Sequence, residues 1–168
     1  MAEIIRSQAV IIGENLIAAS TGVLASSNRL ILTGWEGWDE APEIERTTSP
    51  RLFGDGEVFS RLSSFKAKTF SISFIADLPN STNVRTVRTA IMQVAQRLND
   101  TTTVSMVYYT DGQESFREEL QALPAEDFIS ELEQQGNRLL VTLEFYAPSP
   151  WKTVYLNGSS TPESDKRL

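Results

Sequence analysis

The sequence predicts a mainly β domain with one α-helix, an α+β chain built as an antiparallel β-sandwich or barrel-like domain with a single packed amphipathic helix and a long acidic loop. Short segments of alternating apolar and polar residues, separated by turn residues, run through most of the 168 residues. This period of two is typical of antiparallel strands with one buried and one wetted face. A single stretch has the period of a helix instead.

The composition indicates one core and excludes much chemistry. At about 150 residues per domain the chain makes one domain, and its 40% apolar residues are enough for a buried core. The sequence has no cysteine and no histidine, which excludes disulfides, Cys/His zinc sites, thiol nucleophiles and Ser-His-Asp triads. Any catalysis would have to use carboxylates, Lys, Tyr or Ser alone. No cluster of these residues converges on an enzyme, so we expect no enzyme activity, no metal site and no cofactor.

The charge balance is acidic, with 15 Lys and Arg against 22 Asp and Glu, which gives a net charge of −7. This balance disfavours non-specific binding to nucleic acid, which needs basic patches. The first residues lack a basic region followed by an apolar stretch, and no apolar run approaches about 18 residues. The sequence thus predicts neither a signal peptide nor a membrane span.

The first strands are expected near the N-terminus. A β-branched run from Ser7 to Ile12 stops at Gly13, and Leu16 to Ala19 is expected to return as the second half of a hairpin. Arg29 to Trp35 is predicted to be the next strand.

An acidic excursion follows between Glu36 and Gly56. It carries a concentrated negative charge at Glu36, Asp39, Glu40, Glu43 and Glu45. A calcium site or a catalytic carboxylate pair is an alternative to a solvated acidic loop, but no EF-hand spacing is present. The Gly54-Asp55-Gly56 run fits a turn better than a nucleotide-binding loop, because neither fingerprint spacing follows it.

The longest predicted strand, Phe65 to Asp77, is followed by the helix. Apolar residues spaced by 3, 4, 3 and 4 form one stripe at Val84, Val87, Ile91, Val94 and Leu98. Ser81 or Asn83 is expected to cap the start. Arg85, Arg88 and Arg97 lie on the polar side, where they form either a solvent face or a subunit interface with acidic loops of a neighbour.

Four more strands are predicted after the helix. Val104 to Thr110 and Phe116 to Ala122 are joined by Asp111-Gly112, a dipeptide suited to a tight turn. Glu126 to Glu133 and Arg138 to Tyr146 form a second pair. We therefore expect a β domain over residues 1–153 and a flexible C-terminal tail over residues 154–168.

Six aromatic residues suggest a different class of function. Together they are the set that could stack on sugars: Trp35, Trp38, Trp151, Tyr108, Tyr109 and Tyr146. Ordinary use of these residues in the core is the competing interpretation. A carbohydrate-binding β-sandwich module therefore stays open as an alternative.

The order of features resembles a known family. A strand ending in Trp35-Glu36-Gly37-Trp38 precedes Gly54-Asp55-Gly56, then come the long strand, the helix and two β pairs that end in Leu143-Glu144-Phe145-Tyr146-Ala147-Pro148-Ser149-Pro150-Trp151. This order resembles the N-terminal domain of phage distal tail proteins, the hub proteins of siphophage tail tips, over about residues 5 to 153. Ser149 departs from the family, where Asp is common, and many relatives carry a second carbohydrate-binding or accessory domain.

The resemblance implies a virion structural protein, made in the host cytoplasm and placed at the tail tip. Its partners would be copies of itself in a hexameric baseplate-hub ring, the tail tube protein, and a tail-tip or tail-associated protein. DNA would pass through a central channel, and no membrane partner is implied. A tail tube or tube-terminator subunit is the alternative within the same class.

An acidic channel would let DNA slide, because carboxylates repel phosphates. The candidate channel-lining residues are those of the acidic excursion, Glu36, Asp39, Glu40, Glu43 and Glu45, together with Glu114, Glu118 and Glu119. A ring joins two different faces of neighbouring copies, so these faces should be complementary. Arg85, Arg88 and Arg97 against a neighbour's acidic loop is the candidate interface.

Overall fold

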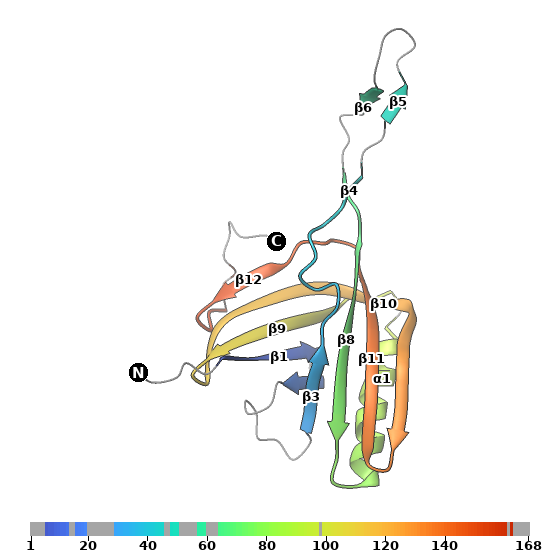
Figure 1. The fold of residues 1–168 in the computed structure, drawn as a ribbon, viewed down its shortest axis with the longest axis vertical. Coiled ribbons are helices and arrows are strands. Elements are labelled where there is room, and N and C mark those ends of the chain that lie inside the picture. Colours follow the sequence, from blue (N-terminus) through green and yellow to red (C-terminus); the bar gives the residue numbers. More distant parts are fainter. Residues whose placement is uncertain are drawn as a thin grey trace.

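Seven strands of the described chain close into a β-barrel, shown in Figure 1. The computed structural model describes residues 6–13, 16–19, 29–45, 48–50, 57–59, 64–97, 99–160 and 162. The elements in this part of the chain are β1 (Arg6–Ile12), β2 (Leu16–Ala19), β3 (Arg29–Gly34), β4 (Ile44–Glu45), β5 (Thr48–Pro50), β6 (Glu57–Phe59), β7 (Ser64–Phe65), β8 (Lys68–Asp77), α1 (Ser81–Ala95), β9 (Thr102–Thr110), β10 (Gln113–Gln135), β11 (Arg138–Ala147) and β12 (Thr153–Leu156).

Strand β10 closes the barrel. The main sheet has the order β11-β8-β3-β2-β1-β9-β10-β12, and β10 also pairs with β11. The first part of β10 pairs with β9 and its last part pairs with β11. The prediction of two separate strands, Phe116 to Ala122 and Glu126 to Glu133, was wrong. Register shifts after Pro124 bend one continuous strand without ending it, as β-bulges do at barrel corners.

The sheet is antiparallel except at one pairing. Strands β2 and β3 run parallel, with Ala19 opposite Ile31. The antiparallel arrangement expected from the sequence therefore does not extend to this pair. Of the two architectures named from the sequence, sandwich or barrel, the closed barrel is the one formed, because β10 is long enough to reach both edges of the sheet.

The period of two places alternate residues of β8 and β11 in the core. Phe70, Ile72 and Phe74 of β8 are buried, as are Leu143 and Phe145 of β11. The rings of Phe70 and Phe145 stack with centroids 5.3 Å apart. The expected strand from Phe65 begins instead at Lys68, since Ser64–Phe65 forms the separate short strand β7.

Helix α1 buries one face against the same core. Its buried residues are Val84, Val87, Ile91 and Val94, four of the five residues of the predicted stripe; Leu98 lies outside the described residues. The N-cap is Asn80 and neither Ser81 nor Asn83. Asn80 has extended backbone angles, and its side-chain oxygen accepts from the Asn83 N–H at 3.0 Å.

The excursion after β3 carries strands of its own. Strand β4 pairs with β7 and β5 pairs with β6, and Figure 1 shows these two small sheets extending away from the barrel. The predicted acidic loop is thus partly β-structured. We call the described residues from Glu43 to Lys66, which include β4 to β7, the arm; the Gly54-Asp55-Gly56 run lies outside the described residues.

The C-terminal segment adds one strand to the sheet. Strand β12 pairs with β10, with Val154 opposite Glu118, and so crosses the expected boundary between residues 153 and 154. Residues 161 and 163–168 of the expected tail lie outside the described part. No helix among the described residues is long and apolar enough to cross a membrane.

Candidate functional site

The turn that follows β3 lies directly on strand β8. The Ser71 N–H donates to the Glu36 carbonyl oxygen at 2.9 Å, and the Trp38 N–H donates to the Trp35 carbonyl oxygen at 3.3 Å. Gly37 has a φ of +80°, and a Cβ there would lie 2.7 Å from the Thr69 carbonyl oxygen. Only glycine allows both this conformation and this approach. Gly37 therefore lets the turn direct Trp38 into the barrel.

Trp38 is the largest fully buried side chain among the described residues. Its ring meets the edge of Phe70 with centroids 5.1 Å apart. Its indole N–H donates to Oε2 of Glu118 at 3.1 Å. A buried tryptophan needs such an acceptor, because an unpaired N–H in the core is costly.

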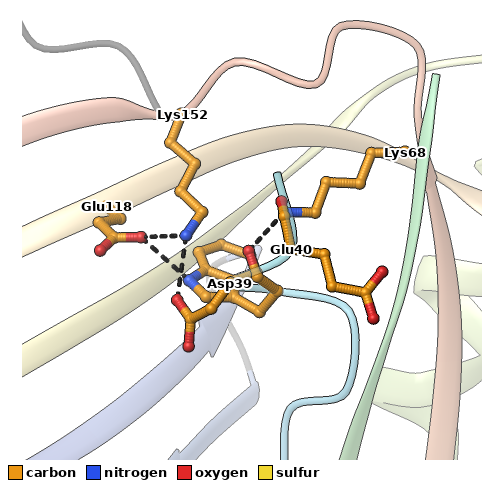
Figure 2. Close-up of polar contacts among 6 residues, drawn as sticks. Asp39, Glu40, Lys68, Glu118 and Lys152 are labelled. Carbon is orange, nitrogen blue, oxygen red and sulfur yellow. Dashed lines mark hydrogen bonds and ion pairs between the residues drawn. The ribbon is translucent and has the colours of Figure 1, made fainter. Parts of the chain in front are cut away.

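Lys152 joins Glu118 to the turn. Figure 2 shows its ammonium between two carboxylates, with Nζ 2.6 Å from Oε2 of Glu118 and 3.2 Å from Oδ1 of Asp39. The same ammonium lies 5.1 Å from the centre of the Trp38 ring, within the range of a cation–π contact. Glu118 and Lys152 are both buried, which makes their pairing necessary.

A second buried lysine holds the turn through its backbone. The Lys68 ammonium donates to the Trp38 carbonyl oxygen and, at 2.9 Å, to the Glu40 carbonyl oxygen. Burial lowers the pKa of Lys68, and the positive charge of Lys152 lowers it further. The carboxylates of Asp39, Glu40 and Glu118 oppose that shift.

These contacts form a clamp across four parts of the chain. We call Trp38, Asp39, Lys68, Glu118 and Lys152 the Trp38 clamp. It ties the turn after β3 to β8, to β10 and to the segment between β11 and β12. The buried Glu118 carboxylate is held by a cation and an N–H donor, an arrangement suited to fixing segments in place. Among the described residues, no cluster of three or more acidic, His or Cys residues could hold a metal ion.

The predicted acidic residues separate into several environments. Asp39 and Glu118 meet at Lys152 in the clamp. Glu119 and Glu114 both face Arg117, at 3.1 Å and 3.8 Å.

On the arm, Glu43 pairs with Lys66 at 3.1 Å, and Glu45 is exposed at the end of β4. The structure thus does not gather these carboxylates into one cluster, and it buries Glu118 inside the protein.

Glu36 and Glu40 line a groove on the outside of the barrel. The groove has a volume of about 360 Å³ and is lined by Glu36, Gly37, Glu40, Thr69, Phe70, Ser71, Ala125 and Glu144. We call it the acidic groove. Its three carboxylates form no ion pair with the described residues. The sequence analysis missed Glu144, because its separation of about 100 residues from Glu36 hides their proximity.

The predicted arginine stripe is only partly on the helix. Arg85 is exposed and Arg88 is half-buried on α1, whereas Arg97 follows the helix end. The prediction that all three share one helical stripe was wrong, since α1 ends at Ala95. None of the three forms an ion pair within the described chain, and the Nε atom of Arg88 has no hydrogen-bond partner there.

The aromatic residues of the carbohydrate alternative lie in several environments, and only Tyr108 and Tyr109 are seen to line one pocket together among the described residues. Trp38 is fully buried in the clamp, Trp151 meets the edge of Phe65 at 4.7 Å, and Tyr108 stacks on Phe116 at 4.2 Å. Trp35 and Tyr146 are exposed. Trp38 is buried and Tyr108 already stacks on Phe116, so two of the six rings proposed for a sugar-binding surface have other partners.

The sequence analysis also missed the two lysines of the clamp. Lys68 had a visible signal, because it is in phase with the buried residues Phe70, Ile72 and Phe74 of β8. Lys152 had none, since it lies outside any strand and its partner Glu118 was interpreted as a surface carboxylate.

Comparison with known proteins finds a similarity of fold but none of sequence family. No protein-family model matches the chain, and no curated protein matches its sequence. The fold is similar to that of the SPP1 Dit (gp 19.1) protein, whose crystal structure is described as a paradigm of the hub adsorption apparatus in phages that infect Gram-positive hosts.

The TM-score of this match is 0.53 at 16% identity, over 87% of this chain and 51% of SPP1 Dit. The chain thus spans about half the length of that protein. The resemblance to phage distal tail proteins, inferred from the order of sequence features, is confirmed for the fold.

Proposed function

We propose that this chain is a structural protein of a phage tail, a distal tail or baseplate hub subunit. Six copies form a ring that joins the tail tube to the tail-tip complex and leaves a channel for DNA. The observation that carries the proposal is the shared fold with the SPP1 Dit hub protein over 87% of the chain. The tail tube protein on one side of the ring and a tail-tip or tail-associated protein on the other are the partners we propose, and the virion tail tip is the proposed location.

The clamp supports a structural role without catalysis. Its buried carboxylate, Glu118, is engaged by Lys152 and Trp38, so it is held as an acceptor and does not face a substrate. We propose that the ring domain, expected over residues 1–153, extends to Leu156 with β12 as its last strand, and that the tail begins after Leu156.

For the channel lining we retain the acidic residues that belong neither to the clamp nor to the acidic groove. These are Glu43 and Glu45 on the arm and Glu114 and Glu119 on β10. Asp39 and Glu118 belong to the clamp, and Glu36 and Glu40 belong to the acidic groove. A lining of carboxylates keeps DNA mobile because it repels the phosphate backbone.

The test is the assembly state of the purified chain. Negative-stain images should show a symmetric ring with a central hole, and light scattering should give six times the subunit mass of 18.7 kDa. Glycan-array binding of the same sample serves as the control for the carbohydrate-binding alternative, and a hub ring should show none. A protein that remains monomeric at every concentration, or that binds glycans as a monomer, would contradict the proposal. Stacked rings that elongate into tubes would favour a tail tube subunit.

A further inference from the structure

The outer face of α1 presents cationic groups without partners. Arg85, Arg88 and Met92 lie three and four residues apart, so they share one side of the helix, with the half-buried Arg88 at the border of the buried stripe. Arg85 is exposed and Met92 is 43% exposed. We call these three residues the arginine face. Neither arginine forms an ion pair within the described residues.

The acidic groove has the complementary charge. Glu36, Glu40 and Glu144 line it around the hydroxyl-bearing residues Thr69 and Ser71. Carboxylates are acceptors only, and guanidinium groups are donors that match them in pairs. The groove is concave while the helix face is convex, so the two surfaces differ in both shape and charge.

The two surfaces lie on opposite sides of the domain. The buried residues of α1 share a core with the inward-facing residues Phe70 and Phe145. Ser71 and Glu144, which are cross-strand partners, alternate with those residues and therefore face outward. Figure 1 shows α1 behind β8 and β11 in this sense. Opposite faces of opposite charge are what a head-to-tail contact between copies joins.

We propose that the arginine face of one copy docks into the acidic groove of the next copy, with Arg85 and Arg88 pairing with Glu36 and Glu144. This inference rests on the proposed ring and names its subunit contact. The net charge of −7 makes most of the surface repel a second copy. An unpaired arginine face is therefore a surface where attraction outweighs that repulsion.

The experiment uses two variants with reversed charges. In the first, Arg85→Glu and Arg88→Glu make the helix face acidic; in the second, Glu36→Lys and Glu144→Lys make the groove basic. Each variant alone should need a protein concentration at least about 100-fold higher to assemble, because like charges then face each other. Mixed in equal amounts, the two should form rings in which they alternate, since each contact again joins opposite charges. Native mass spectrometry with one variant tagged should show equal numbers of both.

The matched control reverses charges elsewhere on the surface. Arg138→Glu with Asp100→Lys changes two exposed positions and should leave the ring intact. Circular dichroism should show the same fold for all variants. If the wild-type chain forms no ring, the proposed function fails and this inference fails with it. If the wild type forms rings and the arginine variant does so equally well, the inference alone is overturned.

Discussion

Two ion pairs lie next to the segment after β3, and they differ in how far their side chains are buried. In the Trp38 clamp, Lys152 lies 2.6 Å from Glu118, and both side chains are at most 10% exposed. On the arm, Lys66 lies 3.1 Å from Glu43, with side chains 52% and 74% exposed. Both pairs join residues far apart in sequence. The clamp pair also receives the Trp38 indole N–H, whereas no further partner is seen for the arm pair among the described residues.

The difference teaches how burial, and not the pairing alone, decides what an ion pair contributes. Water screens the arm pair, and holding two flexible side chains together offsets much of the attraction. The clamp pair is buried, so removing either partner leaves the other as an unpaired buried charge, which is strongly destabilising. The clamp should therefore hold the turn firmly, while the arm pair should contribute little.

The largest effect is expected from Lys152→Met. This change leaves the Glu118 carboxylate buried without its cation, so the free energy of unfolding should fall by about 3–5 kcal/mol. Urea denaturation measures it. Adding Glu118→Gln should recover part of the loss, because a neutral amide oxygen still accepts from Trp38. A loss below about 1 kcal/mol for the single change would show that the buried pair behaves like a surface pair.

A smaller effect is expected where the turn contacts β8. Gly37→Ala should destabilise the protein by more than about 1 kcal/mol, because the new Cβ meets the Thr69 carbonyl oxygen and the φ is positive. Gly136→Ala is the matched control, since Gly136 has a φ of +63° and no atom within 4 Å of an added Cβ. Thermal denaturation should show the larger loss at Gly37, and equal losses would mean that the close approach to β8 has no energetic role.

A pH-dependent effect should separate Lys68 from Lys66. The pKa of Lys68 is lowered in the folded protein, so the unfolded chain binds more protons in the range just below 10.5. Stability should therefore rise with pH across that range, and Lys68→Met should remove this rise. The pKa of Tyr108 is raised, first by burial and then by the charges of Glu118 and Asp39. This contribution to the pH dependence is present in the wild type and in Lys68→Met alike.

Urea denaturation between pH 7 and 10 compares the wild type with Lys68→Met and Lys66→Met. The Lys68 variant should lose the slope, and Lys66→Met, which removes an exposed lysine, serves as the control. Identical slopes for all three proteins would show that the folded protein does not disfavour the charged form of Lys68.

The smallest effect is expected on the arm. Lys66→Met should change the free energy of unfolding by no more than about 1 kcal/mol, because an exposed pair contributes that much at most. The same measurement in high salt should reduce the difference further. A loss as large as that of Lys152→Met would contradict the distinction between the two regions.

Local patterns predicted the elements of this fold well. The alternation of Phe70, Ile72 and Phe74 predicted a half-buried strand, and the spacing of Val84, Val87 and Ile91 predicted the helix face. Both predictions succeed because the geometry of a strand or a helix fixes which residues, close together in sequence, lie on the same face. The continuity of β10 was mispredicted because the register shifts after Pro124, and a local breaker signal does not show whether a strand stops or bends.

The candidate site was much less accessible to sequence reasoning. Trp38 lies 80 residues before Glu118, and 113 residues separate Asp39 from Lys152. Glu118 looked like a surface carboxylate because its neighbours Glu114 and Glu119 are acidic too. Nothing in the pattern of charges indicates which carboxylate meets a buried lysine.

The sequence by itself determined the strands, the helix, the absence of cysteine and histidine chemistry, and the order of elements that resembles phage distal tail proteins. Those properties depend on composition and on residues close together along the chain. Only the tertiary structure decided that β10 closes a barrel, that Glu118 is paired in the interior, and that the arginine face and the acidic groove lie on opposite sides. These depend on contacts between distant residues, whose energies are set by burial, and burial exists only once the chain has folded.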